Sequence, residues 1–558
     1  MVKLQVRDTV AAALAAARRA GDLRLEAVPE WTLETPASRE HGDYSTDVAM
    51  LLARQERLAP PEVAARILKH LPDGGGAIAR AEVAGPGFLN FYLAPGWLGG
   101  VVREVRRRGA AYGRSDGGAG RRVQVEFVSA NPNAPLHVGH GRAAAFGDVL
   151  ARLLEWTGWQ VTRECYVNDA THSAQMLNLG RSLSARYQQL LGRDAPLPEG
   201  ACEGEYVTEL ARAVTDREGD RHLALPEAER ARVFAEVALA EMLAQQRDEL
   251  RRFGVAFDVW FSEQTLHRTG AVAEALDALR AAGHAYEAEG ILWLRATTLG
   301  DDEDHALLRG SSAPTYLAAD AAYHRDKFAR GFDRVIDIWG PDHRRYVART
   351  RAAVAALGID PSRLEIIILQ GVSILKGGEV VRRSRRAGDL IPLSDLIEEV
   401  GPDAARYFLL TRPADTPLDF DVDLARREGR ENLLSRVRDA HARACRALNT
   451  AAEAGRAAPP ADADIELPGE APERDLVRRL ADFPERVAAA AEAREPHRLI
   501  TFVDELAAAL HAFFDTCPPP DGAPSSEPTA ARLALVDACR TVLANALALL
   551  GVSAPESP

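Results

Sequence analysis

The chain has 558 residues, of which 47% are hydrophobic and 27% charged, and its formal net charge is −13. This length and balance predict a soluble globular protein of three or four domains, while acidic residues near the N-terminus exclude a signal peptide. We find no apolar run close to the roughly 20 residues that span a bilayer and no CxxC pair, so we expect a cytoplasmic protein without membrane association or a zinc site.

Residues 1–112 are expected to form a small α+β domain. Apolar residues recur at helical spacing over 4–20 and 60–71, and the run GFLNFYL at 87–93 is typical of a strand. A glycine-rich segment at 113–120 then marks a linker to the next domain.

Between 121 and 423, short apolar runs alternate with helical patterns. The strand-like runs are VQVEFV, QVTRECYV, ILWLRA, RVIDIWG and RLEIIILQG. This alternation predicts an α/β domain of the Rossmann type, with a doubly wound parallel sheet and a ligand at the carboxyl ends of its strands. A charge-rich helical stretch at about 173–290 is predicted to be an insertion, and residues 424–558 are predicted to form an all-α domain.

A turn from a strand into a helix is predicted beside two histidines. Residues 123–127 alternate apolar and polar side chains, prolines break regular structure within 131–135, and apolar residues recur at helical spacing over 146–154. The helix therefore begins near His137 and His140.

The start of this predicted helix suits a phosphate group. Unpaired N–H groups at a helix N-terminus favour an anion, Gly139 gives a phosphate or a base access to the backbone, and His137 and His140 add two donors. These residues predict an ATP site. For the tetrapeptide His-Val-Gly-His alone, a chance match in an ordinary turn is an equally good explanation.

The longer run favours the ATP site. EFVSANPNAPLHVGHGR at 126–142 resembles the first signature of class I aminoacyl-tRNA synthetases, in the form found in arginyl-tRNA synthetases. This resemblance implies a Rossmann-type catalytic domain, catalytic roles for His137 and His140, and ATP contacts from both histidines and from Gly139.

The resemblance extends to both ends of the chain. Residues 41–50 and 81–93 are similar to the N-terminal domain of arginyl-tRNA synthetases, which contacts the elbow of the tRNA. The helical tail after residue 424 is similar to that family's anticodon-binding domain.

The basic run RRSRRAGD at 382–389 resembles the family's second signature, Lys-Met-Ser-Lys-Arg-Ala-Gly. The resemblance implies ATP contacts from Arg382 and Ser384 and a catalytic role for Arg385, which stands where the family has its second lysine. A solvated basic loop is the alternative explanation of such a charge run. Because a guanidinium is larger and planar, losing the aligned lysine contact is expected to lower the rate roughly 10²–10³-fold.

Lysine is rare throughout the chain, which weakens any inference from an arginine at a lysine position. Of the 68 lysine and arginine residues, only Lys3, Lys69, Lys327 and Lys376 are lysines. Family members that lack the second-signature lysine tend to carry a substitute just before the first signature, where this chain has Ala134. Lys376 is expected at a hairpin turn and is therefore a poor substitute.

Recognition of arginine requires carboxylates that pair with its guanidinium, together with a hydroxyl or an amide. Tyr316 and Asp320 are four residues apart and share a helical face. Taken alone, they fit a core tyrosine and a surface aspartate. The resemblance implies instead that they bind the arginine side chain, and that Glu126 and Asn131 also face the amino-acid substrate.

Two further segments depart from the family pattern. The run at 334–347 resembles the segment beside the nucleotide, which implies ATP contacts from Asp342 and His343, but Arg345 replaces a glycine there. The run NLLSRVRDAHAR at 432–443 has lost the family's tyrosines, and its arginines are predicted to meet tRNA phosphates.

The primary hypothesis is an arginyl-tRNA synthetase that activates arginine with ATP and Mg²⁺, holds no protein-bound metal, and charges tRNA(Arg). We expect a monomer. The alternative is a diverged paralogue that acts as a tRNA-binding or regulatory protein or in arginyl transfer without tRNA. A nucleotidyl transferase that binds no tRNA leaves the two terminal resemblances unexplained.

Overall fold

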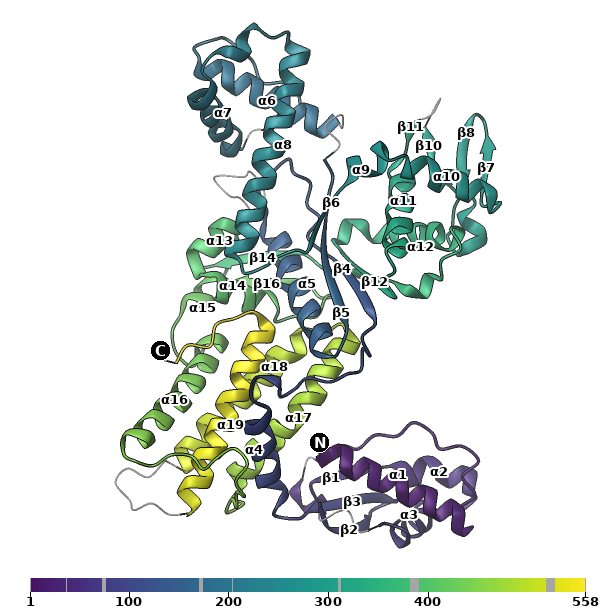
Figure 1. Cartoon of the computed structure of the whole chain (residues 1–558), viewed down its shortest axis with the longest axis vertical. Helices are drawn as coiled ribbons and strands as arrows, with labels where there is room; N and C mark the ends of the chain where they lie inside the picture. The colour runs from purple at the N-terminus through teal and green to yellow at the C-terminus, as the bar shows by residue number, and fades with distance from the viewer. Residues whose placement is uncertain are drawn as a thin grey trace.

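The computed structural model describes residues 2–36, 38–72, 77–169, 174–202, 204–309, 313–381, 391–517 and 527–556. The molecule is elongated (Figure 1). An N-terminal unit lies at one end, near the long C-terminal helices. A parallel sheet occupies the middle, and three helices project at the opposite end.

The N-terminal unit combines helices with one antiparallel sheet of order β1-β3-β2. Val6, Leu52, Ile67 and Phe91 from different elements are fully buried and belong to one apolar cluster. This arrangement confirms the predicted α+β fold. The elements are α1 (Val2–Ala20), β1 (Tyr44–Thr46), α2 (Val48–Glu56), α3 (Pro60–Lys69), β2 (Ile78–Ala84) and β3 (Phe88–Leu93), followed by α4 (Trp97–Arg108).

The central sheet has five parallel strands in the order β13-β12-β4-β5-β6. α5 (Val138–Trp156) connects β4 to β5 and packs closely on the sheet, since a Cβ on Gly147 would lie 2.2 Å from the ring of Phe127. This confirms the predicted doubly wound fold. The strands are β4 (Arg122–Glu126), β5 (Gln160–Val167), β6 (Val259–Ser262), β12 (Arg334–Trp339) and β13 (Leu364–Ile368).

The strand order reverses between β4 and β12, because β5 and β6 lie on one side of β4 while β12 and β13 lie on the other. Such a switch point leaves a crevice at the carboxyl ends of the strands. β4 ends at Glu126 and β12 ends at Trp339, so both open into this crevice.

The placement of ILWLRA in the parallel sheet is wrong. β8 (Ile291–Leu294) pairs antiparallel with β7 (Ala285–Ala288) and β9 (His305–Ala306) in a separate sheet. The Glu289-Gly290 turn has positive φ at both residues and closes a two-residue hairpin. The strand that completes the parallel sheet is β6, which was not identified from the sequence.

The helical stretch predicted at about 173–290 divides into two parts at β6. Before β6, three helices form the projecting unit and surround an apolar cluster of their own, which includes Leu183, Tyr187 and Phe234. The chain rejoins the sheet at Val259, well before residue 290. The three helices are α6 (Ala174–Leu190), α7 (Glu205–Glu218) and α8 (Glu227–Arg252).

After β6 the chain forms a second small unit around another apolar cluster, which includes Leu276, Leu294 and Ala318. The unit contains the sheet β7-β8-β9 and lies beside β12 in Figure 1. Its other elements are α9 (Glu263–Arg268), α10 (Ala271–Ala281), β10 (Leu308–Arg309), β11 (Ala313–Pro314), α11 (Tyr316–Ala329) and α12 (Val347–Ala356).

Beyond β13, a small sheet connects the Rossmann-type region to the C-terminal helices. Its order is β15-β14-β16, with β14 and β15 joined by a hairpin. The elements are β14 (Val372–Lys376), β15 (Glu379–Val381), α13 (Leu393–Val400), α14 (Pro402–Leu409), β16 (Leu418–Asp421) and α15 (Val422–Arg426).

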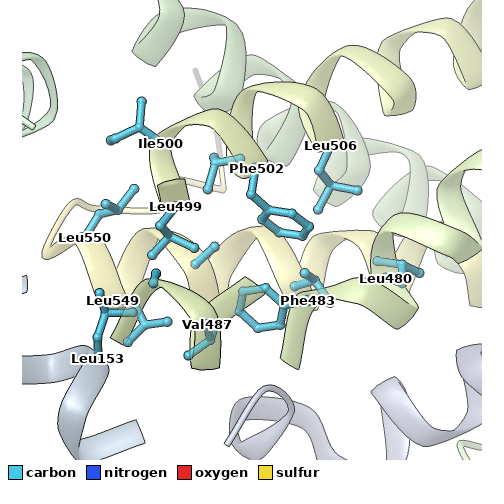
Figure 2. Packing of buried hydrophobic residues seen from close by; sticks show 14 of the residues in the cluster. Leu153, Leu480, Phe483, Val487, Leu499, Ile500, Phe502, Leu506, Leu549 and Leu550 are labelled. Carbon is cyan, nitrogen blue, oxygen red and sulfur yellow. The ribbon is translucent and has the colours of Figure 1, made fainter. Parts of the chain in front are cut away.

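The C-terminal region is helical, as predicted, and shares an apolar core with α5. In Figure 2, Leu153 near the end of α5 lies beside buried residues of α17, α18 and α19, including Phe483, Leu499 and Leu549. The Rossmann-type region, through α5, and the C-terminal helical region therefore share one apolar core. The helices are α16 (Leu433–Glu453), α17 (Ala471–Ala493), α18 (His497–Thr516) and α19 (Glu527–Leu550).

The expectation that no apolar run reaches the length of a membrane span is wrong. By length and composition, Ala530–Leu550 of α19 is apolar enough to cross a membrane. Most of this stretch is buried inside the structure. Its composition is explained by its place in the core of the helical region, where Leu535, Leu543 and Leu547 are fully buried.

Candidate active site

The two signature histidines form the first turn of α5. His137 is the N-cap residue, and its Nδ1 accepts a hydrogen bond from the N–H of Gly139 at 3.1 Å. The Nδ1 of His140 accepts one from the N–H of His137 at 3.3 Å, and the rings stack with centroids 3.7 Å apart. Because both Nδ1 atoms are acceptors, both neutral rings carry hydrogen on Nε2 and offer it as a donor.

Burial keeps these imidazoles uncharged. It lowers the pKa of His137, and it lowers the pKa of His140 to about 3, with a smaller contribution from His137. Gly139 has a steric role as well, because a Cβ there would lie 2.8 Å from Cε1 of His137. The site therefore presents two neutral N–H donors and the N-terminus of a helix, where anions are favoured.

A cavity of about 460 Å³ lies at the carboxyl ends of β4, β5 and β12, against α11. We call it the α11 cavity. It brings together five residues identified from the sequence, from three separate segments: Glu126, Asn131, Tyr316, Asp320 and His343. Ser129 and Asn131 belong to the turn that leads from β4 to the histidines, so the cavity and the start of α5 share this turn.

Asp320 is an unpaired acid in the α11 cavity. Among the described residues, its carboxylate has no hydrogen-bond or ion-pair partner, and burial raises its pKa to about 6. His324 and Arg349 lower that pKa, and Glu126 and Glu263 raise it. Tyr316 lies one turn earlier on α11 and is 63% exposed, which places it at the edge of the cavity. The arrangement suits a cationic ligand.

Glu263 is a cavity residue that the sequence analysis missed. It follows directly on β6, which was also missed, and it starts α9. Tyr166 of β5 lines the same cavity, and burial raises the pKa of Glu263. A carboxylate directly after a strand that ends at the ligand edge of a sheet was the available signal.

Beneath the cavity, Lys327 forms a second feature that the sequence analysis missed. Its Nζ lies 2.5 Å from Oε2 of Glu126 and 2.7 Å from Oδ1 of Asp337, and its side chain is completely buried. The other oxygen of Glu126 accepts a hydrogen bond from Ser129 at 2.8 Å. Glu126 therefore borders the cavity with both carboxylate oxygens already engaged.

A neighbouring network joins α11 to β5. Glu164 is fully buried and receives two hydrogen bonds from Arg330, at 2.6 and 2.9 Å, and one from Tyr323, at 2.6 Å. Arg330 and Tyr323 thus fix α11 against the sheet. Helical spacing places Tyr316, Asp320, Tyr323 and Lys327 on one side of α11.

The segment after β12 forms a short 3-10 helix, Pro341–Tyr346, that carries two residues predicted to contact ATP. His343 lines the α11 cavity, with its ring centroid 6.1 Å from that of Trp339, while Asp342 is exposed and lies outside the cavity lining. Arg345 turns onto Tyr346, donating to its hydroxyl at 2.7 Å. Its bulk does not enter the α11 cavity.

Arg382, Ser384 and Arg385 lie outside the described residues. The chain reaches this segment from β15, which ends at Val381, and continues at residues 391–393. There, Val138 donates to the carbonyl of Ile391 at 3.0 Å and Leu393 donates to the carbonyl of Leu136 at 2.8 Å. The described residues that follow the second signature are thus paired with Leu136 and Val138, beside His137 of the first signature.

The structure shows both positions that were considered for a substitute lysine. Lys376 ends β14 at the hairpin, as expected, and its Nζ lies 2.5 Å from Glu399. At position 134 the alanine offers only its carbonyl, which accepts a hydrogen bond from Gln246 of α8 at 3.2 Å.

The arginines of 432–443 are paired within the protein, which the sequence analysis did not anticipate. Arg436 pairs with Asp504, Arg438 pairs with Asp403, and Arg443 lies 3.3 Å from Asp515. These arginines line a groove of about 970 Å³ along α16, which we call the α16 groove. Other basic residues at its edge are Arg426, Arg427 and Arg430.

Comparison with known proteins agrees along the whole chain. Residues 4–93 match the model of the arginyl tRNA synthetase N-terminal domain, residues 106–198 match the catalytic domain of class I (R) tRNA synthetases, and residues 437–557 match the DALR anticodon binding domain. The chain is 47% identical over 560 residues to the arginine–tRNA ligase of Heliobacterium modesticaldum, covering 100% of this chain and 99% of the relative. It is also 47% identical to that of Moorella thermoacetica, covering 98% and 97%.

Solved structures show the same fold. A putative arginyl-tRNA synthetase from Campylobacter jejuni aligns with a TM-score of 0.76 at 31% identity, covering 84% of this chain and 100% of that one. The arginyl-tRNA synthetase of Thermus thermophilus aligns over 100% of both chains with the same TM-score, at 22% identity. None of these relatives supports the alternative of a regulatory or non-tRNA arginyl-transfer protein. The chain belongs to the arginyl-tRNA synthetase family, class I aminoacyl-tRNA synthetases that act as arginine–tRNA ligases.

Proposed function

We propose that the α11 cavity binds arginine and that the start of α5 binds ATP, so that arginyl-adenylate forms where the two sites meet. The observation that carries this proposal is the unpaired carboxylate of Asp320 in a cavity that shares a turn with His137 and His140. A partly buried acid without a partner is costly unless a cation compensates it. The guanidinium of arginine is such a cation.

The orientation of arginine follows from the position of the phosphates. Its carboxylate must reach the α-phosphate, so its main-chain end points toward the turn before α5. There, Glu126 and Asn131 face the α-ammonium group. The side chain extends the other way along α11, where Asp320 and Tyr316 receive the guanidinium, with Glu263 across the cavity.

ATP is held by neutral donors in this proposal. The Nε2–H groups of His137 and His140 donate to phosphate oxygens and stabilise the charge that builds up as the arginine carboxylate attacks the α-phosphorus. Pyrophosphate leaves, and Gly139, Asp342 and His343 hold the nucleotide. Arg382, Ser384 and Arg385 contribute further phosphate contacts.

Mg²⁺ enters with ATP as part of the substrate. Among the described residues, no group of three or more His, Cys, Asp or Glu side chains is arranged to hold a metal ion. In the second step, a hydroxyl of the terminal ribose of tRNA(Arg) attacks the activated carbonyl, and AMP leaves.

We also propose that each domain has its own function. Residues 1–112 contact the tRNA, residues 121–423 carry out both chemical steps, and residues 424–558 bind the anticodon. The enzyme works as a monomer in the cytoplasm without membrane association.

The decisive experiment combines two assays on the full chain, with ATP and Mg²⁺ present. Charging of total tRNA with radiolabelled arginine tests the whole reaction, and tRNA-dependent pyrophosphate exchange tests activation alone. Robust charging supports the proposal, whereas folded protein active in neither assay contradicts it. In the same assays, Arg385→Ala is expected to lower turnover more than ATP affinity, and equal losses would remove its assigned role.

A further inference from the structure

Lys327 is the only lysine among the described residues whose side chain is completely buried. The side chains of Lys3, Lys69 and Lys376 are 27%, 66% and 53% exposed, and each pairs with one carboxylate. Lys327 is 0% exposed and pairs with two, Glu126 and Asp337. Lysine is rare in this chain, and Lys327 differs from the other three lysines in being completely enclosed between two carboxylates.

The surroundings of Lys327 favour a compact cation. Its ammonium lies 4.3 Å from the ring centre of Tyr323 and within hydrogen-bond distance of carboxylates on two neighbouring strands, β4 and β12. A planar guanidinium is wider and does not fit between two carboxylates at 2.5 and 2.7 Å without displacing a strand. Lys327 thus links α11 to both strands at the switch point.

The link is extended by His324, which is also buried. Its Nε2 lies 2.9 Å from Oδ2 of Asp337, and its Nδ1 donates to the carbonyl of Asp320 at 2.7 Å. Asp337 is therefore shared between Lys327 and His324. Through these contacts the backbone of Asp320 is tied to the same network that holds Glu126.

We propose that Lys327 is a positioning residue for arginine: it holds Glu126 ionised and in place at the main-chain end of the α11 cavity, while Asp337 and His324 hold the turn that carries Asp320. This inference rests on the proposed binding of arginine in the cavity. It assigns Lys327 a role through Glu126 and Asp320, without contact to the substrate.

Removing the cation has a specific consequence. Burial raises the pKa of Glu126, and Lys327 is the strongest influence that opposes the rise. Burial also acts on Asp337, but Lys327 and His324 together lower its pKa to about 2. Removing Lys327 takes away the strongest influence that lowers the pKa of Glu126, so we expect Glu126 to take up a proton more readily and then no longer to attract the α-ammonium group.

The groups that face Glu126 come from three elements. Lys327, Tyr323 and Asp320 belong to α11, Tyr166 and Cys165 belong to β5, and Asp337 belongs to β12. Burial raises the pKa of Tyr166, Tyr323 and Cys165 well above neutrality, so they stay uncharged. Lys327 is the cation in contact with Glu126, while His324 lies on the far side of Asp337 and Arg349 lines the α11 cavity.

The test is calorimetric titration of arginine into the full chain from pH 6.5 to 8.5, comparing Lys327→Met with the unaltered protein at each pH. The ratio of the two dissociation constants cancels the titration of arginine itself. At pH 7 we expect binding to weaken roughly 10- to 100-fold, because a charge-assisted contact is lost. The ratio should fall as pH rises and Glu126 ionises again.

Two control variants separate positioning from general stability. Lys69→Met removes an exposed lysine that pairs with Asp22 and should leave arginine binding unchanged. Arg406→Met removes a buried cation that lies 2.5 Å from Asp148, away from the cavity. It should lower the melting temperature but produce no pH-dependent ratio.

A merely structural role for Lys327 predicts a ratio that is the same at every pH, and that result overturns the inference. In tRNA-dependent pyrophosphate exchange, KM for arginine should rise while kcat at saturating arginine changes far less. Lys327→Met/Glu126→Gln lacks the Glu126 carboxyl and should lose the pH dependence. If Lys327→Met does not fold, Glu126→Gln serves instead: it removes the carboxyl that Lys327 is proposed to hold, so arginine binding as tight as in the unaltered protein would contradict the proposal.

Failure of the site and failure of the inference are distinguishable in the same titration. If Asp320→Asn binds arginine as tightly as the unaltered protein, arginine does not occupy the cavity as proposed. If Asp320→Asn weakens binding while Lys327→Met gives a pH-independent ratio, the site stands and only the role of Lys327 is lost.

Discussion

The α11 cavity and the α16 groove are both rich in charge, but their charges are paired differently. In the cavity, Asp320 has no partner among the described residues. In the groove, Arg436, Arg438 and Arg443 each face an aspartate of the same chain. An unpaired buried charge raises the free energy of the empty protein, whereas a paired one contributes to the fold. A small cation can therefore bind in the cavity and pair with Asp320. A ligand of the groove would first have to break the ion pairs that its arginines form with aspartates of the same chain.

The substitution Asp320→Asn is the strongest test of whether an acid without a partner binds the ligand. We expect kcat/KM for arginine to fall roughly 100- to 1,000-fold, because the guanidinium loses its charged partner in a desolvated site. Pyrophosphate exchange in the presence of tRNA provides the measurement. Asp326→Asn is a matched control on the same helix, since Asp326 is 37% exposed and pairs with Arg330. Similar losses of kcat/KM in the two variants would show that the unpaired Asp320 is no more important for arginine than the paired Asp326.

The pH dependence of arginine use sharpens the same contrast. The pKa of Asp320 is raised to about 6, so its carboxylate is ionised at pH 7 and takes up a proton as the pH falls through 6. Below that value, kcat/KM for arginine should drop roughly tenfold per pH unit. A profile followed from pH 8 to 5 tests this, and Asp320→Asn should abolish the decline. A flat profile down to pH 5 would argue for a different arginine partner.

The groove is probed by releasing one of its arginines. Asp504→Asn frees Arg436, which is then available to a phosphate. If Arg436 meets the tRNA backbone, affinity should rise several-fold, and the slope of log K against log salt should steepen by about 0.9 or less. Filter binding of tRNA at several salt concentrations measures both quantities. Unchanged affinity and slope would mean that the pair is structural and lies outside the tRNA contact.

The smallest effect is expected at Lys376. Its ammonium is half-exposed and held by Glu399 at the β14–β15 hairpin. Such surface pairs contribute about 0–1 kcal/mol, so Lys376→Ala should leave the rate of pyrophosphate exchange within about fivefold of the unaltered enzyme. A hundredfold loss would mean that Lys376 substitutes for the missing signature lysine after all.

Most of the fold was predictable because its signals are local. Alternating residues at 123–127 and the helical stripe of α5 identified the first strand, turn and helix of the Rossmann-type unit. The error at β8 arose because an apolar run of four residues looks the same in a parallel and an antiparallel sheet. Only the short Glu289-Gly290 turn separates the two cases.

The site was predictable where a motif placed its residues, and unpredictable where partners were distant in sequence. The four-residue spacing of Tyr316 and Asp320 could be recognised in the sequence. The pairing of Lys327 with Glu126 could not, because 201 residues separate them. The pairing of Arg436 with Asp504 bridges 68 residues. Sequence shows which charges exist, but only the fold shows which of them are already satisfied.

α5 connects the core of the C-terminal helical region to the proposed phosphate site. Its 19 residues span roughly 28 Å, with the two histidines at one end and Leu153 in the core of Figure 2 near the other. Pivoting such a rod by about 2° at its far end displaces the imidazoles by roughly 1 Å, a misplacement that can cost about 100-fold in rate. Core substitutions around Leu153 can therefore slow the chemistry from a distance while the protein remains folded.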